Sequence, residues 1–412
     1  MHSQLSLRAI ALVSAIAGLA ACDQPSEAGT PASEARPTEA AAAKPVAPQP
    51  VSGVSAPHGA PAPAQASVVE VTEVAKGLSF PWSLAFLPDG RMLVTERPGT
   101  MRFIAVDGEL SAPLANVPAV YANGQGGLLD VALSPSFADD AGIYFSYAEA
   151  GEDGFAGTAL AKAKLTETAL EDVEVIFRQQ PKLSQGGHFG SRIVFDGEGH
   201  LFLTVGENQQ RPTAQRLDHL QGKVVRLNLD GSIPSDNPFV GQADARPEIW
   251  SYGHRNPQGA ARHPLTGELW TSEHGPRGGD EINRPQPGKN YGWPFATFGI
   301  NYSGDPIPES VGTQIAGAEL PHYYFEISPA LSGMAFYFDQ RFASWNGSLF
   351  LGALASRELI RLQLDGDRIV AEERLLSDRK ERLRDVRVGP DGFVYVLTDE
   401  ADGKLLRVGL KP

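Results

Sequence analysis

Short runs of alternating aliphatic and polar residues recur along the chain, and each lies beside a tight turn that contains glycine. The four clearest copies span residues 86–96, 195–207, 263–273 and 388–400. In each copy an approach segment leads into the turn and a strand-like segment leaves it, which is the pattern of a β-hairpin. The pattern therefore predicts an antiparallel β protein built from repeated hairpins.

Two weaker copies, at 132–147 and 336–354, extend the series to six units. Repeats that each form one antiparallel sheet are typical of β-propellers. We therefore predict an all-β fold, a six-bladed β-propeller; a β-sandwich in which the turns recur by chance is the alternative. The turn glycines that mark the six units are Gly90, Gly142, Gly199, Gly267, Gly347 and Gly392.

The spacing of the units is uneven, and the two longest gaps flank Gly267. Insertions in a repeat fold usually collect on one face, so we expect the embellished face to be built around residues 248–294. Helical patterns are few, and only 159–170 and 209–220 are predicted as short helices.

The stretch 248–294 combines ionisable side chains with glycines, prolines and tryptophans. An unpaired charge inside a protein is costly unless a ligand, metal or partner satisfies it. The stretch therefore predicts the floor of a binding or catalytic site, and an ordinary hairpin with solvated charges is the alternative. Its polar residues are His254, Arg255, Asn256, Glu273, His274, Asp280 and Glu281.

The N-terminal residues 1–22 are typical of a secretory signal, with an apolar run followed by small residues. Because Cys22 ends a Leu-Ala-Ala-Cys sequence that is similar to a bacterial lipoprotein box, we expect a lipid on Cys22 and a periplasmic, membrane-tethered protein. A plain signal peptide with a chance cysteine is the alternative. Residues 23–67 are rich in Ala and Pro and predict a disordered spacer, which leaves 68–412 as the propeller domain.

Charge and cysteine content narrow the possible partners. The chain carries 35 Lys and Arg against 49 Asp and Glu, a formal net charge of −14. Binding to a phosphate backbone depends on clustered cations, so nucleic acid is not expected as a partner. Cys22 is the only cysteine, which rules out an intrachain disulfide and a cysteine-ligated metal site.

Several polar residues stand beside glycines at corresponding positions of different units, where the blades of a propeller converge. His188, between small residues, predicts a general base or a structural histidine. Arg382 and Arg384 share one strand face and are suited to carboxylates, or form an exposed edge. Asp280 and Glu281 supply oxygen ligands of the kind calcium uses, which is a weak signal alone. Gln125, Arg255 and Asn256 complete the set of candidates.

Six motifs in this order resemble one family, and they are GQGGLLDVALSPSF, GGHFGSR, SYGHRNPQG, EHGPRGGDEIN, NYGWP and RLRDV. From residue 77 to 409 the sequence resembles the soluble glucose and sorbosone dehydrogenases that depend on pyrroloquinoline quinone, and among them the periplasmic aldose sugar dehydrogenases. The resemblance implies a six-bladed propeller. It also implies oxidation of aldoses to lactones, with electrons passed to a respiratory acceptor.

The resemblance also assigns roles. His188 would take the proton of the anomeric hydroxyl, and Arg255 would stabilise charge on the cofactor. Gln125, Asn256, Arg382 and Arg384 would hold the cofactor. The main-chain carbonyls of Gly275 and Pro276 would bind the catalytic Ca²⁺, and Glu281 and Tyr291 would lie at a structural one.

The sequence departs from that family pattern at two positions. Ala355 stands where similar proteins often carry a cofactor-binding lysine, although Arg357 follows two residues later. Gly187 precedes the expected base where glucose-specific members have aspartate, so we expect broad aldose oxidation. Two other functions remain open for a propeller of this kind, a calcium-dependent lactonase and a non-catalytic glycan-binding protein.

Overall fold

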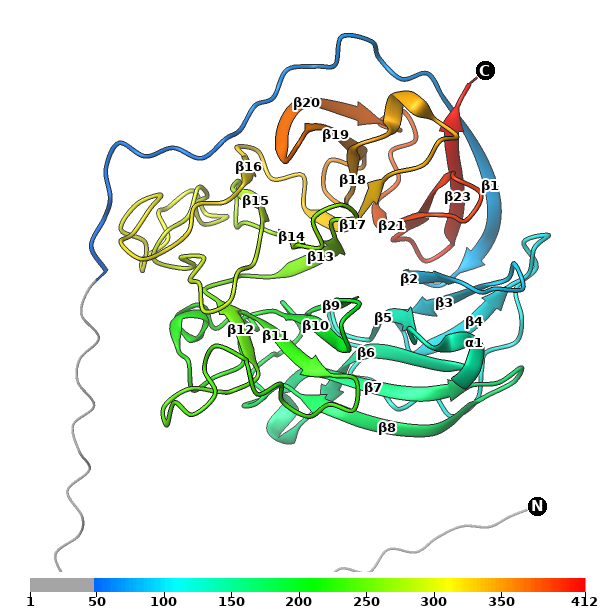
Figure 1. Cartoon of the computed structure of the whole chain (residues 1–412), viewed down its shortest axis with the longest axis horizontal. Helices are drawn as coiled ribbons and strands as arrows, with labels where there is room; N and C mark the ends of the chain where they lie inside the picture. Colours follow the sequence, from blue (N-terminus) through cyan, green and yellow to red (C-terminus); the bar gives the residue numbers. More distant parts are fainter. Residues whose placement is uncertain (1–47, 412) are drawn as a thin grey trace, which may run out of the picture. The chain divides into compact units, whose positions relative to one another are not determined.

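A computed structural model describes residues 48–411 of the chain. Within this part the protein is almost entirely β-structure, arranged as six small sheets around a central axis (Figure 1). The predicted six-bladed β-propeller is therefore confirmed, and the β-sandwich is excluded. Five of the six marker glycines lie in the turn between the first and second strand of a blade, and Gly142 is the first residue of the second strand of its blade. The predicted signal peptide, and the lipid site at Cys22, lie outside the described residues.

The sheets follow one another along the chain. Blade 1 has β2 (Pro81–Phe86), β3 (Met92–Glu96) and β4 (Thr100–Ile104). Blade 2 has β5 (Leu128–Leu133), β6 (Gly142–Ala150), β7 (Ala156–Leu165) and β8 (Leu170–Arg178). Blade 3 has β9 (Gly190–Phe195), β10 (His200–Val205), β11 (Lys223–Asn228) and β12 (Ile249–Tyr252).

Blade 4 has β13 (Pro257–Arg262), β14 (Leu269–Glu273), β15 (Asp280–Asn283) and β16 (Tyr323–Phe325). Blade 5 has β17 (Leu331–Tyr337), β18 (Ser348–Ala353), β19 (Leu359–Asp365) and β20 (Arg368–Leu375). Blade 6 has β21 (Leu383–Val388), β22 (Val394–Thr398) and β23 (Gly403–Leu410). The helical segments are short, and they are α1 (Phe137–Asp140), η1 (Glu152–Gly154), η2 (Arg211–Gln215) and η3 (Ala343–Trp345).

The ring is closed by β1 (Val69–Leu78), which comes first in the sequence but forms the outer strand of blade 6. It pairs antiparallel with β23, from Val69 opposite Leu410 to Leu78 opposite Gly403, and the two strands lie side by side in Figure 1. Because blade 6 takes strands from both ends of the domain, the backbone hydrogen bonds of this one sheet join the two ends of the ring.

The hydrophobic cores lie between neighbouring blades. Phe103 of blade 1 packs in one cluster with Phe145 of blade 2, and Leu203 of blade 3 clusters with Leu160 of blade 2. Similar clusters fill the remaining contacts around the ring. Alternation along each strand sends apolar side chains to both faces of a blade, so every sheet is held by the sheets on either side.

Buried ion pairs join the inner strands of several blades inside the channel. Arg192 contacts Asp130 at 3.0 Å and Asp385 at 2.9 Å, and Arg387 contacts the same two carboxylates at 2.9 Å each. The two carboxylates and Arg192 are at most 2% exposed. The four side chains come from the inner strands of blades 2, 3 and 6, and they form a closed ring in which each charge faces two of the opposite sign.

Of the two short helices predicted from the sequence, one is absent from the described residues and the other forms only in part. Residues 159–165 belong to β7, and no helix forms at 159–170 because this segment pairs with β6 on one side and β8 on the other. The region 209–220 forms only the short 3₁₀ segment η2. Helical propensity is a weak local preference, and sheet pairing overrides it here. No helix in residues 48–411 is long and apolar enough to span a membrane.

The end of the predicted disordered spacer also differs from expectation. Residues 48–67 run in an extended path along the outer edges of blades 4 and 5 (Figure 1), and we call this segment the strap. Pro57 and Pro61 accept hydrogen bonds from the backbone of Tyr324 and Glu372, and Ser67 bonds the carboxylate of Glu373. The strap carries few apolar residues, but its backbone satisfies polar groups on otherwise unpaired strand edges.

Candidate functional site

The candidate site lies at the end of the channel where the inner strands begin and the second strands of the blades finish. In an antiparallel hairpin these two positions lie at the same edge of the sheet. Gln125, His188, Arg255 and Arg382 each precede an inner strand, and Glu207, His274 and Asp399 each follow a second strand. The repeat therefore brings together residues that are far apart in the sequence.

His188 is held in a defined orientation by a buried carboxylate. Its Nδ1 lies 2.5 Å from Oε2 of Glu207, and the two side chains are 9% and 1% exposed. Burial lowers the pKa of His188, the Glu207 charge opposes that shift, and the Arg255 charge adds to it. The ring is therefore neutral at neutral pH, with the proton on Nδ1 donated to the Glu207 carboxylate and Nε2 left as the basic nitrogen.

Two amide side chains lock the backbone around His188. Gln125 accepts a hydrogen bond from the backbone N–H of His188 at 2.9 Å, and Asn256 accepts one from Gly190 at 3.0 Å. Asn256 is fully buried, and its Nδ2 has no hydrogen-bond partner among the described residues. His188 adopts a positive φ of 56°, a strained conformation that such surrounding contacts maintain.

Arg255 lies between the histidine and residues 273–276. Its backbone N–H donates to Glu273 at 2.7 Å, its Nη1 donates to the carbonyl of His274 at 3.0 Å, and its guanidinium lies 5.4 Å from the Trp293 ring centre. Nε of Arg255 is buried without a partner within residues 48–411. A buried donor of this kind is costly to leave unpaired, so Arg255 has a free N–H for a ligand.

Arg382 and Arg384 lie on the wall of a cavity of about 340 Å³ at the mouth of the channel. Both donate to the same oxygen of Asp399, at 3.1 Å in each case, and Arg384 also donates to Gln258 at 2.6 Å. Arg384 is 6% exposed, so it is not the exposed edge residue of the alternative interpretation. Its Nε has no partner in the described part of the chain.

Gly275 and Pro276 lie in the turn that follows β14. The N–H of Gly275 donates to Asp280 at 2.9 Å, and burial raises the pKa of Asp280 to about 6. A Cβ at position 275 would meet the carbonyls of Gly278 and Gly279 at 2.3 Å. Only glycine fits here, so the turn is held tightly in one conformation.

Glu281 and Tyr291 line one small void of about 10 Å³ together with Glu273. Burial, and then the charge of Glu273, raise the pKa of Glu281 well above its ordinary value. The Tyr291 hydroxyl donates to the carbonyl of Arg284 at 2.5 Å, so it is already used. In residues 48–411 no group of three or more His, Cys, Asp or Glu side chains is placed to hold a metal ion.

Four residues of the site were not predicted from the sequence. Glu207 and Asp399 sit at the same repeat position as Glu96 and Glu273, directly after or at the end of a second strand, and this shared position was the signal available. The other two, Arg97 of blade 1 and Gln258 of blade 4, line the cavity and are not among the candidates from the sequence. His274, which belongs to the predicted floor 248–294, lines the cavity as well.

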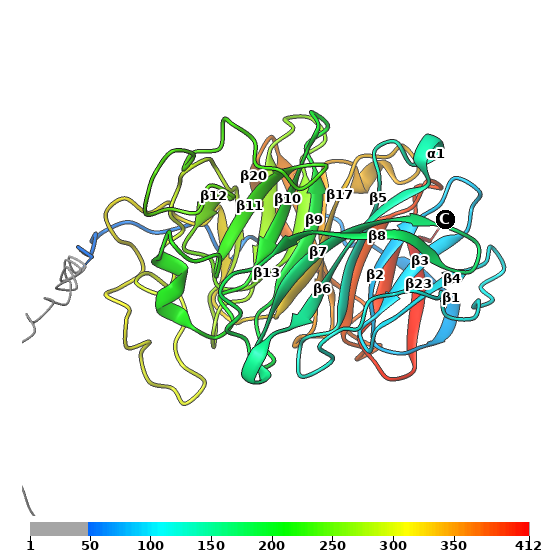
Figure 2. The ribbon, with the colours of Figure 1, turned by 90° about the horizontal axis from the view of Figure 1, so that it is seen from below.

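The insertion between β15 and β16, residues 284–322, reaches back to this end of the channel. Trp293 lies in the same small void as Arg255 and Gly275, and Arg211, in the β10–β11 connection, contacts Glu309 of the insertion at 3.3 Å. Figure 2 shows the insertion as yellow loops that project beyond the strands. Both long connections beside Gly267 thus contribute to the embellished region, as the spacing predicts.

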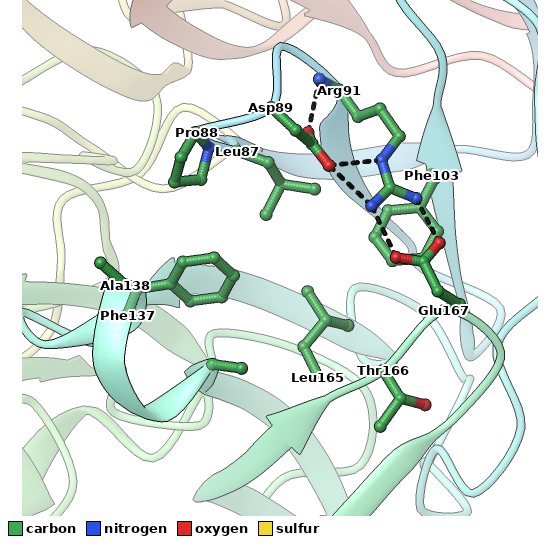
Figure 3. Close-up of a pocket in the computed structure, with 11 residues that line it drawn as sticks. Leu87, Pro88, Asp89, Arg91, Phe103, Phe137, Ala138, Leu165, Thr166 and Glu167 are labelled. Atoms are coloured by element: carbon green, nitrogen blue, oxygen red, sulfur yellow. Dashed lines mark hydrogen bonds and ion pairs between the residues drawn. The ribbon is translucent and has the colours of Figure 1, made fainter.

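A separate cavity of about 440 Å³ lies between blades 1 and 2, beside the connections at the other ends of the strands. Its wall is apolar, with Phe103, Phe137 and Leu165 facing inward (Figure 3). At its edge Arg91 contacts Asp89 and Glu167, each at 2.7 Å (Figure 3). None of the predicted site residues lines this cavity, so it is not the candidate site.

The residues at the channel mouth fit a flat, acidic cofactor. The cavity has guanidinium groups from Arg97, Arg382 and Arg384 in its wall. Arg97 and Arg384, and also Arg255 in the adjoining void, each have a buried Nε with no partner in the part of the chain that the structure describes. Planar guanidinium groups bind carboxylates in preference to neutral ligands. The donor set therefore suits a cofactor such as pyrroloquinoline quinone.

Comparison with known proteins gives one consistent family. Residues 78–407 match the family model described as Glucose / Sorbosone dehydrogenase. The aldose sugar dehydrogenase YliI of Escherichia coli is 55% identical over 345 residues, covering 83% of this chain and 93% of that protein. The apo crystal structure of the E. coli soluble aldose sugar dehydrogenase superposes with a TM-score of 0.82, covering 84% of this chain and all of that one.

A structure with bound cofactor is also similar. The aldose sugar dehydrogenase of Streptomyces coelicolor, in its form bound to pyrroloquinoline quinone, is 29% identical and superposes with a TM-score of 0.70. The match covers 85% of this chain and the whole of that one.

Proposed function

Because this chain belongs to the glucose/sorbosone dehydrogenase family, we propose that it is an aldose sugar dehydrogenase that uses pyrroloquinoline quinone and Ca²⁺ to oxidise the anomeric carbon of sugars to a lactone. The observation that supports this most directly is the buried His188–Glu207 pair beside a cavity lined by arginines. The cofactor, when bound, would accept a hydride from the anomeric carbon.

His188 is suited to remove the proton of the anomeric hydroxyl. Its Nδ1 is tied to Glu207 at 2.5 Å, so Nε2 is the nitrogen that receives the proton. Burial keeps the free ring neutral, and the Glu207 carboxylate stabilises the imidazolium once it forms. This division of labour resembles other histidine–carboxylate pairs, in which the carboxylate fixes the tautomer and does not itself take the proton.

The other residues of the site would bind and orient the cofactor and Ca²⁺. Arg255 would face the cofactor oxygens with its free Nε, and Arg382 and Arg384, on the wall of the cavity at the channel mouth, would meet its carboxylates. Gln125, which lines the cavity, and Asn256, whose Nδ2 has no partner among residues 48–411, would also hold the cofactor. Each of them also bonds the backbone around His188. The carbonyls of Gly275 and Pro276 would hold Ca²⁺, and the void beside Glu281 and Tyr291 would take a second, structural Ca²⁺, whose charge would favour the ionised form of Glu281.

The environment of Gly187 supports a broad choice of aldose. A Cβ at this position would lie 2.6 to 2.9 Å from the terminal side-chain atoms of Gln209, which is exposed and can move aside, so the residue type, and not a lack of space, determines what stands beside the base. The chain therefore has no acidic side chain at position 187 to contact one particular sugar hydroxyl. We expect several aldoses to be oxidised with similar efficiency.

We place the enzyme in the periplasm, tethered by a lipid on Cys22 and passing electrons to a respiratory acceptor. This part of the proposal rests on the N-terminal sequence alone. Metabolic labelling with a fatty-acid analogue tests it, and a Cys22→Ser variant that still incorporates the label would contradict it.

Reconstitution tests the enzymatic proposal. The purified protein is incubated with pyrroloquinoline quinone and Ca²⁺, and reduction of a redox dye is followed with a panel of aldoses. We expect turnover with several aldoses that requires both additions. Hydrolysis of a lactone without the quinone would indicate the lactonase alternative. Sugar binding without any turnover or any cofactor-induced absorbance change would indicate a glycan-binding propeller.

A further inference from the structure

We infer that Arg97 is a third cationic ligand for the cofactor carboxylates, and that it supplies the charge which a lysine at position 355 would otherwise provide. This inference rests on the proposed function, because it concerns the same cavity. Nothing in the sequence motifs points to Arg97, since it follows the first hairpin, far from the RLRDV segment that holds the other two arginines.

The fold fixes Arg97 firmly at the edge of the cavity. Its backbone N–H donates to the carbonyl of Phe80 at 3.0 Å, and its carbonyl accepts from Leu128 at 3.1 Å. Gly127 approaches so closely that a Cβ there would lie 1.9 Å from this carbonyl. Position 97 is therefore held by the start of β2 on one side and the start of β5 on the other.

The side chain of Arg97 is directed into the cavity and retains free donors. Its guanidinium lies 4.8 Å from the ring centre of Phe80, and Nη1 donates to the carbonyl of Gly124 at 2.5 Å. Phe80 and Arg97 both line the cavity that contains Arg382 and Arg384. Nε of Arg97 is buried with no partner in the described chain, so a ligand carboxylate would satisfy it.

The electrostatics of the cavity leave a role for a third cation. Arg382 and Arg384 share one carboxylate oxygen of Asp399, so their two positive charges are partly neutralised before any ligand binds. Burial favours the neutral acid, but the charges of Arg384, Arg97 and Arg382 together hold the pKa of Asp399 below its ordinary value. The field of Arg97 therefore reaches the same carboxylate as the pair, and it adds a charge that has no acidic partner of its own among the described residues.

Arg357, the other cation near position 355, is directed elsewhere. Its Nη1 donates to the carbonyl of Lys380 at 3.2 Å, it is exposed, and it does not line the cavity. Near Ala355 the cavity is lined by Leu354, whose carbonyl accepts a hydrogen bond from Arg382. The charge of the missing lysine is thus supplied by Arg97 of blade 1, which lines the same cavity.

A cofactor-binding titration tests the inference independently of turnover. The apoprotein with Ca²⁺ is titrated with pyrroloquinoline quinone, and binding is followed by the change in absorbance of the quinone or in protein fluorescence. We expect Arg97→Ala to raise the Kd about ten-fold, the effect of losing one hydrogen bond to a charged group. Arg97→Lys should recover part of that affinity, and Arg357→Ala should leave Kd unchanged.

Two further measurements separate a ligand role from a structural one. The Kd of the wild type should increase more steeply with ionic strength than that of Arg97→Ala, because the variant makes one fewer ion pair that salt can screen. The methyl ester of the cofactor, whose carboxylates are neutral, should bind the wild type and Arg97→Ala equally. The melting temperatures of the apoproteins identify any variant that has lost its fold.

The outcomes distinguish this inference from the proposed function. If the wild type binds the quinone and Arg97→Ala binds it equally well, the role of Arg97 is wrong and the proposed function stands. A loss of affinity in Arg97→Ala that is the same for the cofactor and its ester also overturns the role, since it reflects cavity shape. If the wild type itself does not bind the quinone, the proposed function fails first.

Discussion

Replacing Glu207 with glutamine tests the catalytic pair most sharply. The carboxylate lies 2.5 Å from Nδ1 of His188 and is 1% exposed, so the change alters charge and hydrogen-bond direction with almost no change in volume. A glutamine amide group can donate to Nδ1 where the carboxylate only accepts. The His188 proton then moves to Nε2, and the nitrogen that faces the substrate is no longer basic.

The expected loss follows from two effects. A charge pair in contact at low exposure is worth on the order of 4 kcal/mol at an effective dielectric constant of about 20, and this stabilisation of the imidazolium would be lost. General base catalysis by a positioned side chain contributes about 10²–10⁴-fold. We therefore expect Glu207→Gln to lower kcat by about 10²–10⁴-fold, with a small change in the Kd of the cofactor. Glu207→Asp keeps the charge and should recover part of the rate.

The pH profile provides the more specific readout. The base works when it is deprotonated, so the activity of the wild type falls as pH decreases through the pKa of His188. Burial already lowers that pKa, and the Glu207 charge opposes the shift. Without the charge the pKa falls further, so the acidic limb of kcat/KM should move to lower pH while the plateau drops. An unchanged plateau and an unmoved limb would refute the assignment of Glu207 and of His188 together.

Three further predictions concern the base His188, the cofactor-binding Arg382 and the strap. His188→Ala should abolish dye reduction while the Kd of the cofactor changes less than about three-fold, and normal turnover would rule out its role. Arg382→Ala should raise the cofactor concentration that gives half-maximal reconstitution by about five- to ten-fold, since it loses a hydrogen bond to a charged group. An unshifted titration would contradict the role of Arg382 in binding the cofactor. Deletion of residues 48–66 should lower the melting temperature by roughly 3–10 °C, because it removes several edge hydrogen bonds worth about 0.5–1.5 kcal/mol each. An equal melting temperature for the deleted and full chains would show that the strap contributes no stability.

The repeat makes the fold predictable from the sequence. Turn glycines such as Gly90 and Gly392 mark the same point of each blade, so the number of such turns along the chain equals the number of blades. The closing strand β1 carries no such marker, because its partner β23 lies at the other end of the chain. The register of that pairing is a long-range property, which local alternation does not encode.

Residues 156–165 show where local patterns mislead. Their alanines, lysines and leucines have high helical propensity, yet this segment is the central strand β7, paired on both sides. The strap shows the opposite error, because its Ala- and Pro-rich composition resembles a spacer. Its Pro57 and Pro61 lack N–H donors, but their carbonyls still satisfy the edges of blades 4 and 5.

The candidate site is predictable where polar residues stand beside glycines, as His188 does, or at strand spacing, as Arg382 and Arg384 do. Glu207 is marked only by its position at the end of a repeat, and Arg97, which follows a second strand, is marked by no local motif. Their role depends on which blades meet at the channel mouth, and this is determined by closure of the ring. Convergence across blades is therefore the part of the site that the local sequence does not encode.

An anaerobic titration of the reconstituted protein with an aldose tests the central claim most directly. The protein is loaded with pyrroloquinoline quinone and Ca²⁺, and one equivalent of sugar is added without any electron acceptor. The account predicts that the absorbance of the bound quinone changes to that of its reduced form with one lactone produced per cofactor, and that His188→Ala, loaded in the same way, does not change. A loaded wild-type protein whose quinone stays oxidised in the presence of every aldose tested would contradict it.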